Sequence, residues 1–134
     1  MADNTIKSDI LDFGIEEPSN SIIKVIGVGG GGGNAVNHMY KEGIHDVTFV
    51  LCNTDNQALN RSDVPVKVPL GRNITQGLGA GNKPERAMMA AEESMEDIRK
   101  MLSDGTKMVF ITAGMGGGTG TGAAPVIARF AKDM

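Results

Sequence analysis

Short apolar runs alternate with longer amphipathic segments along most of the chain, and stretches rich in glycine lie between them. Residues 22–28, 47–52 and 107–113 are apolar, largely β-branched runs of strand length, which is typical of buried strands. Residues 64–70 form a further run, but its two prolines favour an edge strand or a short piece. The pattern therefore predicts three strands and a fourth, marginal one.

Apolar residues recur at helical spacing in other parts of the chain. Residues 34–42 show this pattern and are followed by Gly43, a residue type favoured just beyond a helix. A longer helix is predicted over residues 82–103, and a last helix is predicted to carry Pro125 in its first turn. The apolar stripe of the long helix consists of Met88, Ala91, Met95, Ile98 and Leu102.

The order of these elements is strand, helix, strand, strand, helix, strand, helix. This alternation predicts the α/β class, with a mostly parallel Rossmann-like sheet covered by helices on both faces. The three strands at residues 22–28, 47–52 and 107–113 run into residues 27–33, 53–55 and 114–122, while residues 71–81 are predicted to form a long glycine-rich loop. Because ligands of such sheets bind outside the carboxyl ends of the strands, the first three loops are predicted to share one edge.

Composition and charge narrow the possible functions. The chain has 134 residues and a net charge of −3. Its net negative charge lies in residues 1–21, which carry five acidic side chains and one lysine and which we predict to be a disordered tail. Residues 22–134 then form part of one domain. No basic footprint is present and aromatic residues are only 4%, which argues against nucleic acid as a partner. A lone cysteine, with no signal peptide or membrane-length apolar stretch, predicts a cytoplasmic protein.

The first glycine-rich loop follows the first strand and precedes a helix. Residues 27–32 match G-x-G-x-x-G, in which glycines let backbone N–H groups approach an anion at a helix N-terminus. A dinucleotide-binding Rossmann domain fits this loop equally well, so an NAD(P)-dependent oxidoreductase remains an alternative. That class should carry an acidic residue at the end of the second strand, where this chain has Cys52 and Asn53, with the acid only at Asp55.

The second glycine-rich loop, residues 114–122, is the more informative one. It again joins a strand to a helix, and Thr119 and Thr121 add hydroxyl donors for phosphate oxygens. A Rossmann domain needs one such loop, whereas two loops with two helix N-termini form a cradle for a chain of phosphates. The sequence therefore favours a nucleotide with several phosphates over a dinucleotide.

A third small-residue segment, residues 77–82, would permit backbone contact with a terminal phosphate, although alone it resembles an ordinary surface loop. None of the three glycine clusters contains lysine or arginine, and no Walker pattern is present. Amide dipoles and a bound Mg²⁺, held mainly by phosphate oxygens and water, would then meet the phosphate charge. Asn53 or Asp55 could hold one of those waters or a ribose hydroxyl, while Asp55 fits a helix cap equally well.

Five motifs, the first of which lies within the last, together resemble the tubulin/FtsZ family of GTPases, and they are more similar to its bacterial cell-division branch than to eukaryotic tubulin. GGGTGTG at residues 116–122 resembles the tubulin signature motif. The others are IKVIGVGGGGGNAVNHM at 23–39, NTDNQAL at 53–59, GLGAGNKPE at 77–85 and FITAGMGGGTGTGAAPVIA at 110–128. The resemblance covers about residues 22–134, in the order and spacing of the family.

The resemblance implies GTP or GDP as ligand, with Mg²⁺, and it alone implies guanine specificity. The residues it implies as ligands of the phosphates, sugar and metal are Gly29, Gly30, Gly31, Gly32, Gly33 and Asn34, then Asn53, Thr54 and Asp55, then Ala80, Gly81 and Asn82 near the γ-phosphate, and finally Gly116, Gly117, Gly118, Thr119, Gly120 and Thr121.

The resemblance also implies GTP hydrolysis between subunits stacked head to tail, in filaments that form the mid-cell division ring. Expected partners are further copies of the protein and other cell-division proteins, with the membrane reached only through tethering proteins. Catalytic residues, the remainder of the GTPase domain, a central helix and a C-terminal domain are expected after Met134. The chain alone is therefore expected to be inactive. A catalytically dead nucleotide-binding scaffold is a further alternative.

Overall fold

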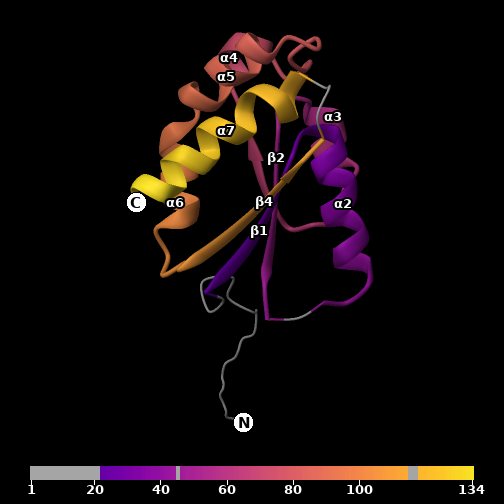
Figure 1. Ribbon diagram of the computed structural model, residues 1–134. Coiled ribbons are helices and arrows are strands. Elements are labelled where there is room, and N and C mark those ends of the chain that lie inside the picture. Colours follow the sequence, from indigo (N-terminus) through magenta and orange to yellow (C-terminus); the bar gives the residue numbers. More distant parts are fainter. Residues whose placement is uncertain (1–21, 45, 115–117) are drawn as a thin grey trace.

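The computed structural model describes residues 22–44, 46–114 and 118–134. Its strands are β1 (Ile23–Val28), β2 (Thr48–Asn53), β3 (Val66–Pro69) and β4 (Met108–Ala113). They form one sheet in the order β3-β2-β1-β4, and each neighbouring pair is parallel (Figure 1). The predicted α/β class and all predicted strands are thereby confirmed, including the edge position of the proline-containing β3.

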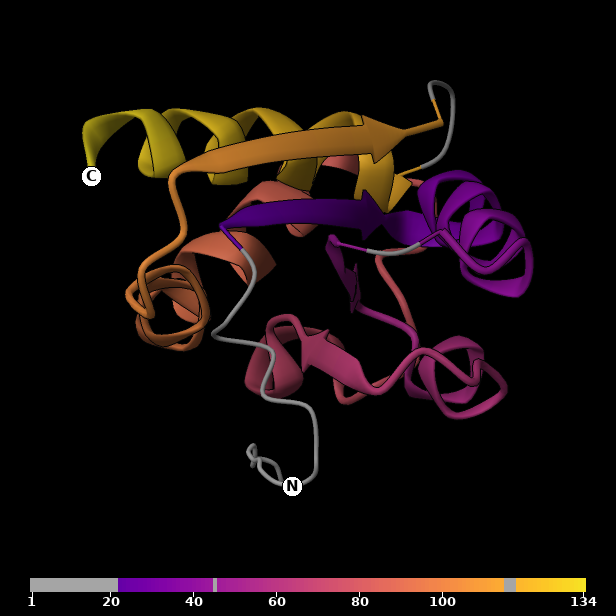
Figure 2. The same ribbon diagram turned by 90° about the horizontal axis from the view of Figure 1, so that it is seen from below.

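The helices cover both faces of this sheet (Figures 1 and 2). They are α2 (Gly29–Lys41), α3 (Asn56–Asn60), α4 (Arg72–Thr75), α5 (Pro84–Glu93), α6 (Met95–Leu102) and α7 (Gly118–Asp133). Within the described residues, no helix is both long and apolar enough to cross a membrane.

Alternate residues of the central strands supply two separate cores. Ile26 and Val50 point into the larger core, which α5, α6 and α7 cover, whereas Phe49 and Leu51 point into a smaller core beneath α2 and α3. This alternation follows from the two-residue period of a strand. Cys52 lies in the larger core, where burial raises the pKa of its thiol to about 12, so it is a packing residue as its apolar surroundings predict.

The glycines at residues 29–33 are helical, which corrects the prediction of a loop before a helix at residue 34. α2 already begins at Gly29, and only this first residue has a left-handed backbone, with φ of 76°. A Cβ atom on Gly32 would overlap the carbonyl oxygen of Thr112 in β4, and one on Gly27 would overlap the carbonyl oxygen of Gly32. The glycines therefore serve close packing of the helix on two strands, and this packing outweighs their low helix propensity.

The predicted long helix is two helices, because Ser94 interrupts it. The Ser94 hydroxyl accepts a hydrogen bond from the N–H of Gly71 at 2.9 Å, and Gly71 has a left-handed backbone that begins the unpredicted helix α4. The predicted apolar stripe is also wrong at Met88, which is 43% exposed; Ala87 and Ala90 are buried in its place. Small side chains face the core here because α5 packs closely on α7.

α7 begins at Gly118 and so places Pro125 two turns inside the helix, not in its first turn as predicted. Pro125 is exposed, on the side of the helix away from the core. A Cβ on Gly118 would lie 2.7 Å from the backbone nitrogen of Lys83, and one on Gly122 would overlap the carbonyl oxygen of Pro84. Glycine is therefore required where α7 crosses the start of α5.

A buried lysine anchors the opposite end of β1. Lys24 is 2% exposed and its Nζ lies 2.7 Å from both carboxylate oxygens of Asp104, with a further hydrogen bond to the carbonyl oxygen of Met101. Burial acts to raise the pKa of the Asp104 carboxyl, but hydrogen bonds from Lys24 and Thr106 and the Lys24 charge outweigh it and lower that pKa. The pair ties β1 to the connection between α6 and β4.

Gly32→Ala tests whether close packing explains the glycines of α2. The substitution should lower the free energy of unfolding by about 1–3 kcal/mol, because the added methyl group meets a strand backbone that cannot move aside easily. Gly33→Ala is the matched control, since its Cβ would meet only Leu51 Cδ2, at 3.9 Å, and should be neutral or slightly stabilising. Urea unfolding without nucleotide measures both, and equal stability of the two variants would contradict the explanation.

Candidate functional site

The two predicted glycine-rich loops meet at the carboxyl edge of the sheet, where α2 and α7 both begin (Figure 1). A Cβ on Gly29 would lie 2.9 Å from the backbone nitrogen of Gly120, and one on Gly31 would lie 3.0 Å from the Cα of Gly114. At both points backbone approaches backbone so closely that an added Cβ would be crowded. The N-termini of two long helices, each carrying a partial positive charge, therefore lie side by side.

The turn after β2 is held by its own polar side chains. Asn53 Oδ1 accepts hydrogen bonds from the N–H groups of Thr54 at 2.8 Å and Asp55 at 3.2 Å. Asp55 Oδ1 accepts from the N–H groups of Gln57 at 2.9 Å and Ala58 at 3.3 Å. Asp55 therefore caps α3, which is one of the two roles predicted for it. The carboxylate can still accept further hydrogen bonds, and these are available to a ligand.

The third predicted segment is attached to this turn. The N–H of Gly79 donates to the carbonyl oxygen of Thr54 at 3.2 Å, and the N–H of Asn56 donates to the carbonyl oxygen of Gly77 at 3.0 Å. Farther along, Asn82 passes so close to α7 that a Cβ on Gly118 would lie 2.8 Å from its Cα. The segment therefore belongs to the site and is not a separate surface loop.

One side-chain hydrogen bond joins the turn after β2 to the start of α7. Thr54 Oγ1 and Thr119 Oγ1 are 2.8 Å apart, and either hydroxyl is able to donate. Thr54 is 1% exposed, whereas Thr119 is half-buried. Of the two threonines predicted to offer hydroxyls, Thr119 thus faces the site.

All three predicted segments line one cavity of about 560 Å³. The predicted site residues on its walls are Gly30, Gly31, Asn53, Thr54, Asp55, Ala80, Gly81, Asn82, Gly118, Thr119 and Gly120. Gly29, Gly33 and Asn34 line an adjoining cavity of about 270 Å³, which shares Gly30 and Asn53 with the first. The two cavities form one continuous candidate site along the start of α2.

Two of the predicted site residues that the structure describes line neither cavity. Gly32 lines neither cavity, because it packs against Thr112, and Thr121 lines neither although it lies one turn into α7. Gly116 and Gly117 lie outside the described residues. The glycine motif therefore mixes residues that face the cavity with residues that let α2 approach the sheet.

Arg61 lines the candidate site, although the sequence prediction did not include it. It lines both cavities, as does Ala58, which lies three residues earlier. Residues three apart share a helix face, and Arg61, the C-cap of α3, keeps a helical backbone, so Ala58 and Arg61 lie on the same side. The predicted helix cap at Asp55 could have pointed to Arg61, because it implies a short helix that ends beside the site. A search for basic residues within the glycine clusters could not have identified Arg61.

The charged groups of this site are few. Of the described residues that line the two cavities, Asp55 is the acidic one and Arg61 the basic one. No group of three or more histidine, cysteine or acidic side chains suited to a metal ion occurs among the described residues. The chemistry available on the walls is that of amide N–H groups, hydroxyls and one guanidinium, a donor set that suits an anion.

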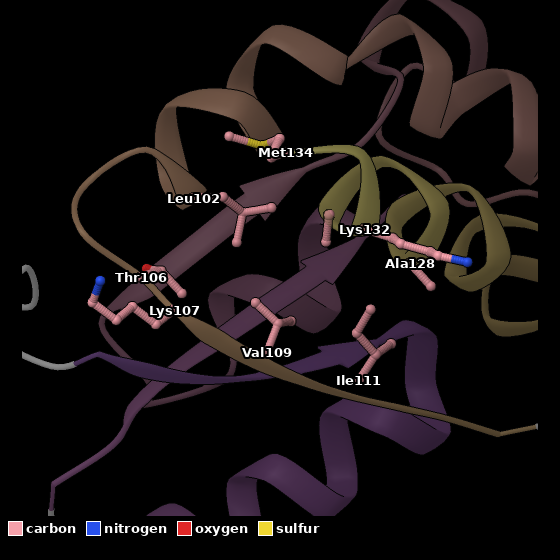
Figure 3. Close-up of a pocket in the computed structure, with 9 residues that line it drawn as sticks. Leu102, Thr106, Lys107, Val109, Ile111, Ala128, Lys132 and Met134 are labelled. Carbon is pink, nitrogen blue, oxygen red and sulfur yellow. The ribbon is translucent and has the colours of Figure 1, made fainter.

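A larger cavity, of about 620 Å³, lies at the opposite end of β4 and α7 (Figure 3). Its walls are mainly apolar, with Val109 and Ile111 from β4 and Leu102 from α6, and Lys107 and Lys132 add charge. It contains no glycine and no helix N-terminus among its lining residues. Size alone therefore does not select the candidate site; the donor groups do.

Comparison with known proteins assigns the family. The family model described as "Tubulin/FtsZ family, GTPase domain" matches residues 22–134. The chain belongs to the tubulin/FtsZ family. Within this family, the cell division protein FtsZ of Porphyromonas gingivalis is 60% identical over 135 residues, which cover 100% of this chain and 29% of that protein. FtsZ of Coxiella burnetii is 56% identical over 125 residues, which cover 93% of this chain and 32% of that protein.

Solved structures of the family agree in fold. An empty FtsZ dimer from M. jannaschii matches with a TM-score of 0.80 and 45% identity, over 84% of this chain and 33% of that one. CetZ2 from Haloferax volcanii, solved as a GTPγS-bound protofilament, matches with a TM-score of 0.70 and 28% identity, over 80% and 34%. The chain thus spans about a third of the length of these relatives.

Removing the cap at Asp55 should open α3 locally. Asp55→Ala should cost about 1 kcal/mol of local stability and speed hydrogen exchange of the Gln57 and Ala58 amides, because both lose their acceptor. Asp55→Asn keeps a side-chain oxygen and should retain most of the protection. Amide exchange followed by NMR measures both variants, and unchanged exchange in Asp55→Ala would show that the cap contributes little.

Proposed function

We propose that residues 22–134 are the N-terminal part of the GTP-binding domain of a cell-division GTPase that polymerises head to tail. The observation that carries this proposal is the backbone contact of Gly29 and Gly31 with Gly120 and Gly114, which brings two helix N-termini to one cavity. Two such termini suit a run of phosphates, whereas a dinucleotide needs one. The bound nucleotide is GTP or GDP, as in the family to which the chain belongs.

In this proposal the chain holds phosphates with main-chain amides. The start of α2 at Gly30 and Gly31 and the start of α7 at Gly118 to Gly120 present N–H groups and helix dipoles toward the cavity. The Thr119 hydroxyl adds a donor, and Arg61 adds the positive charge that the glycine segments lack. Ala80, Gly81 and Asn82 line the same cavity beside the start of α7, where a terminal phosphate would lie.

The residues present also fit Mg²⁺ bound mainly through phosphate oxygens and water. Mg²⁺ prefers oxygen ligands and keeps several waters, so it does not need a cluster of acidic side chains. Asp55, whose Oδ1 is engaged by the cap, has acceptor capacity left for one such water. When bound, the metal would neutralise phosphate charge, and Asp55 would help to orient its water shell.

A dinucleotide-binding oxidoreductase fits these groups less well. That reading needs a carboxylate at the end of β2 for the ribose, yet β2 ends at Asn53, whose Oδ1 already accepts two backbone N–H groups. The nearest carboxylate, on Asp55, caps α3. The start of α7 at the same cavity would also be left without a role.

We further propose that hydrolysis takes place between stacked subunits in the cytoplasm at the division site. Asp55 is the acidic residue among the described cavity walls, and its cap contacts make it a poor general base for an attacking water. A carboxylate from a neighbouring subunit would supply that group. Further copies of the protein and other division proteins are then the partners.

The decisive experiment compares ligands and protein concentrations. The full-length gene product should bind GTP in preference to ATP and NAD, and its phosphate release per molecule should rise as protein concentration rises, because assembly completes the site. Residues 1–134 alone should bind GTP weakly and release no phosphate. Preference for NAD would support the oxidoreductase reading, and GTP binding without phosphate release at any concentration would indicate a catalytically dead scaffold.

Arg61→Gln tests the cation of the site separately. The substitution should weaken GTP binding about fivefold, a modest effect because Arg61 is exposed to solvent, and should make binding less dependent on salt. Arg129→Gln, which changes the same charge on an exposed part of α7 away from both cavities, is the matched control. Isothermal titration at two salt concentrations measures both, and equal affinities of the two variants would remove Arg61 from the site.

A further inference from the structure

We propose that Thr54 is a positioning residue, which holds the Thr119 hydroxyl as a donor toward a phosphate group in the cavity. The proposal rests on the proposed function, since it concerns the ligand of the same site. Its basis is the distance of 2.8 Å between Thr54 Oγ1 and Thr119 Oγ1, which joins the turn after β2 to the start of α7. These two residues are 65 positions apart in the sequence.

Hydrogen bonds hold the backbone N–H and the carbonyl oxygen of Thr54. Its N–H donates to Asn53 Oδ1 at 2.8 Å, and its carbonyl oxygen accepts from the N–H of Gly79 at 3.2 Å. The Thr75 hydroxyl also lies 3.4 Å from the same carbonyl oxygen, although its single proton has a nearer acceptor in the carbonyl oxygen of Gly71 at 3.1 Å. With its backbone held and its side chain 1% exposed and β-branched, Thr54 offers its hydroxyl at one defined point.

The direction of the hydrogen bond follows from the ligand. A hydroxyl has one proton to donate, and ionised phosphate oxygens only accept. Thr119 lines the cavity at the start of α7. Its hydroxyl must therefore donate its hydrogen bond to the phosphate and accept one from the Thr54 hydroxyl. The two hydroxyls then act in series, Thr54 to Thr119 to phosphate, and each bond polarises the next.

The same residue connects two walls of the site. Through its carbonyl oxygen Thr54 holds Gly79, at the start of the segment that carries Ala80 to Asn82, and through its hydroxyl it holds Thr119. Loss of the hydroxyl alone would leave the backbone contacts in place. Its effect on a ligand should therefore pass through Thr119, which makes a specific test possible.

A double-mutant cycle in the full-length gene product provides that test, with affinity for GTPγS in the presence of Mg²⁺ as the readout. Thr54→Val should weaken binding about three- to tenfold, the range expected for one hydrogen bond, and Thr54→Ser should restore it to within about twofold. Thr119→Val should weaken binding at least as much. Thr54→Val added to Thr119→Val should cause no further loss, because Thr54 acts through Thr119.

Thr106→Val is the matched control, since its hydroxyl donates to Asp104 at 2.7 Å, at the other end of the sheet, and its loss should leave affinity unchanged. Thermal unfolding without nucleotide checks each variant, and Thr54→Ala completes the same cycle if Thr54→Val does not fold. Additive losses, or wild-type affinity in a folded Thr54 variant without the hydroxyl, would overturn the proposal. Failure of the wild-type protein to bind GTPγS would instead overturn the proposed function.

Discussion

The architecture of the site depends on direct contact between backbones at the carboxyl edge of the sheet. Gly29 and Gly31 of α2 touch Gly120 and Gly114, and Gly32 touches the backbone of Thr112. Any side chain at these points would separate α2 from β4 and from the start of α7. Their close approach lets the N-termini of both helices act on one volume, so that two weak dipoles add at the same place.

The second requirement is a rigid turn after β2, and its own polar groups supply it. Asn53 and Asp55 satisfy four backbone N–H groups within the turn and at the start of α3. The bond to the Thr54 N–H is buried and would be costly to lose, and the other three add to it in holding the turn. Thr54, at the centre, is thereby able to contact both the third segment and α7.

Strand prediction succeeded because each strand is a short run rich in β-branched and other apolar residues, although only β1 and β2 lie inside the sheet and Met108 and Phe110 of β4 are exposed. Helix boundaries were harder to predict. A glycine-rich segment predicts a loop, because glycine is unfavourable in an isolated helix. In this protein α2 and α7 nevertheless include their glycines, because close packing of α2 on the strands and of α7 on α5 compensates for the low helix propensity. The break at Ser94 depends on Gly71, 23 residues away, and so has no local signal.

The amino-acid sequence alone determined the alternation of strands and helices, and hence the edge at which the glycine segments must lie, because connections between parallel strands leave little choice. It also carried the family resemblance, which comparison confirmed. Only the tertiary structure decided which glycines face the cavity and which serve packing, that Arg61 joins the walls, and that Thr54 meets Thr119. These facts depend on distances between segments far apart in the chain, which local residue patterns do not encode.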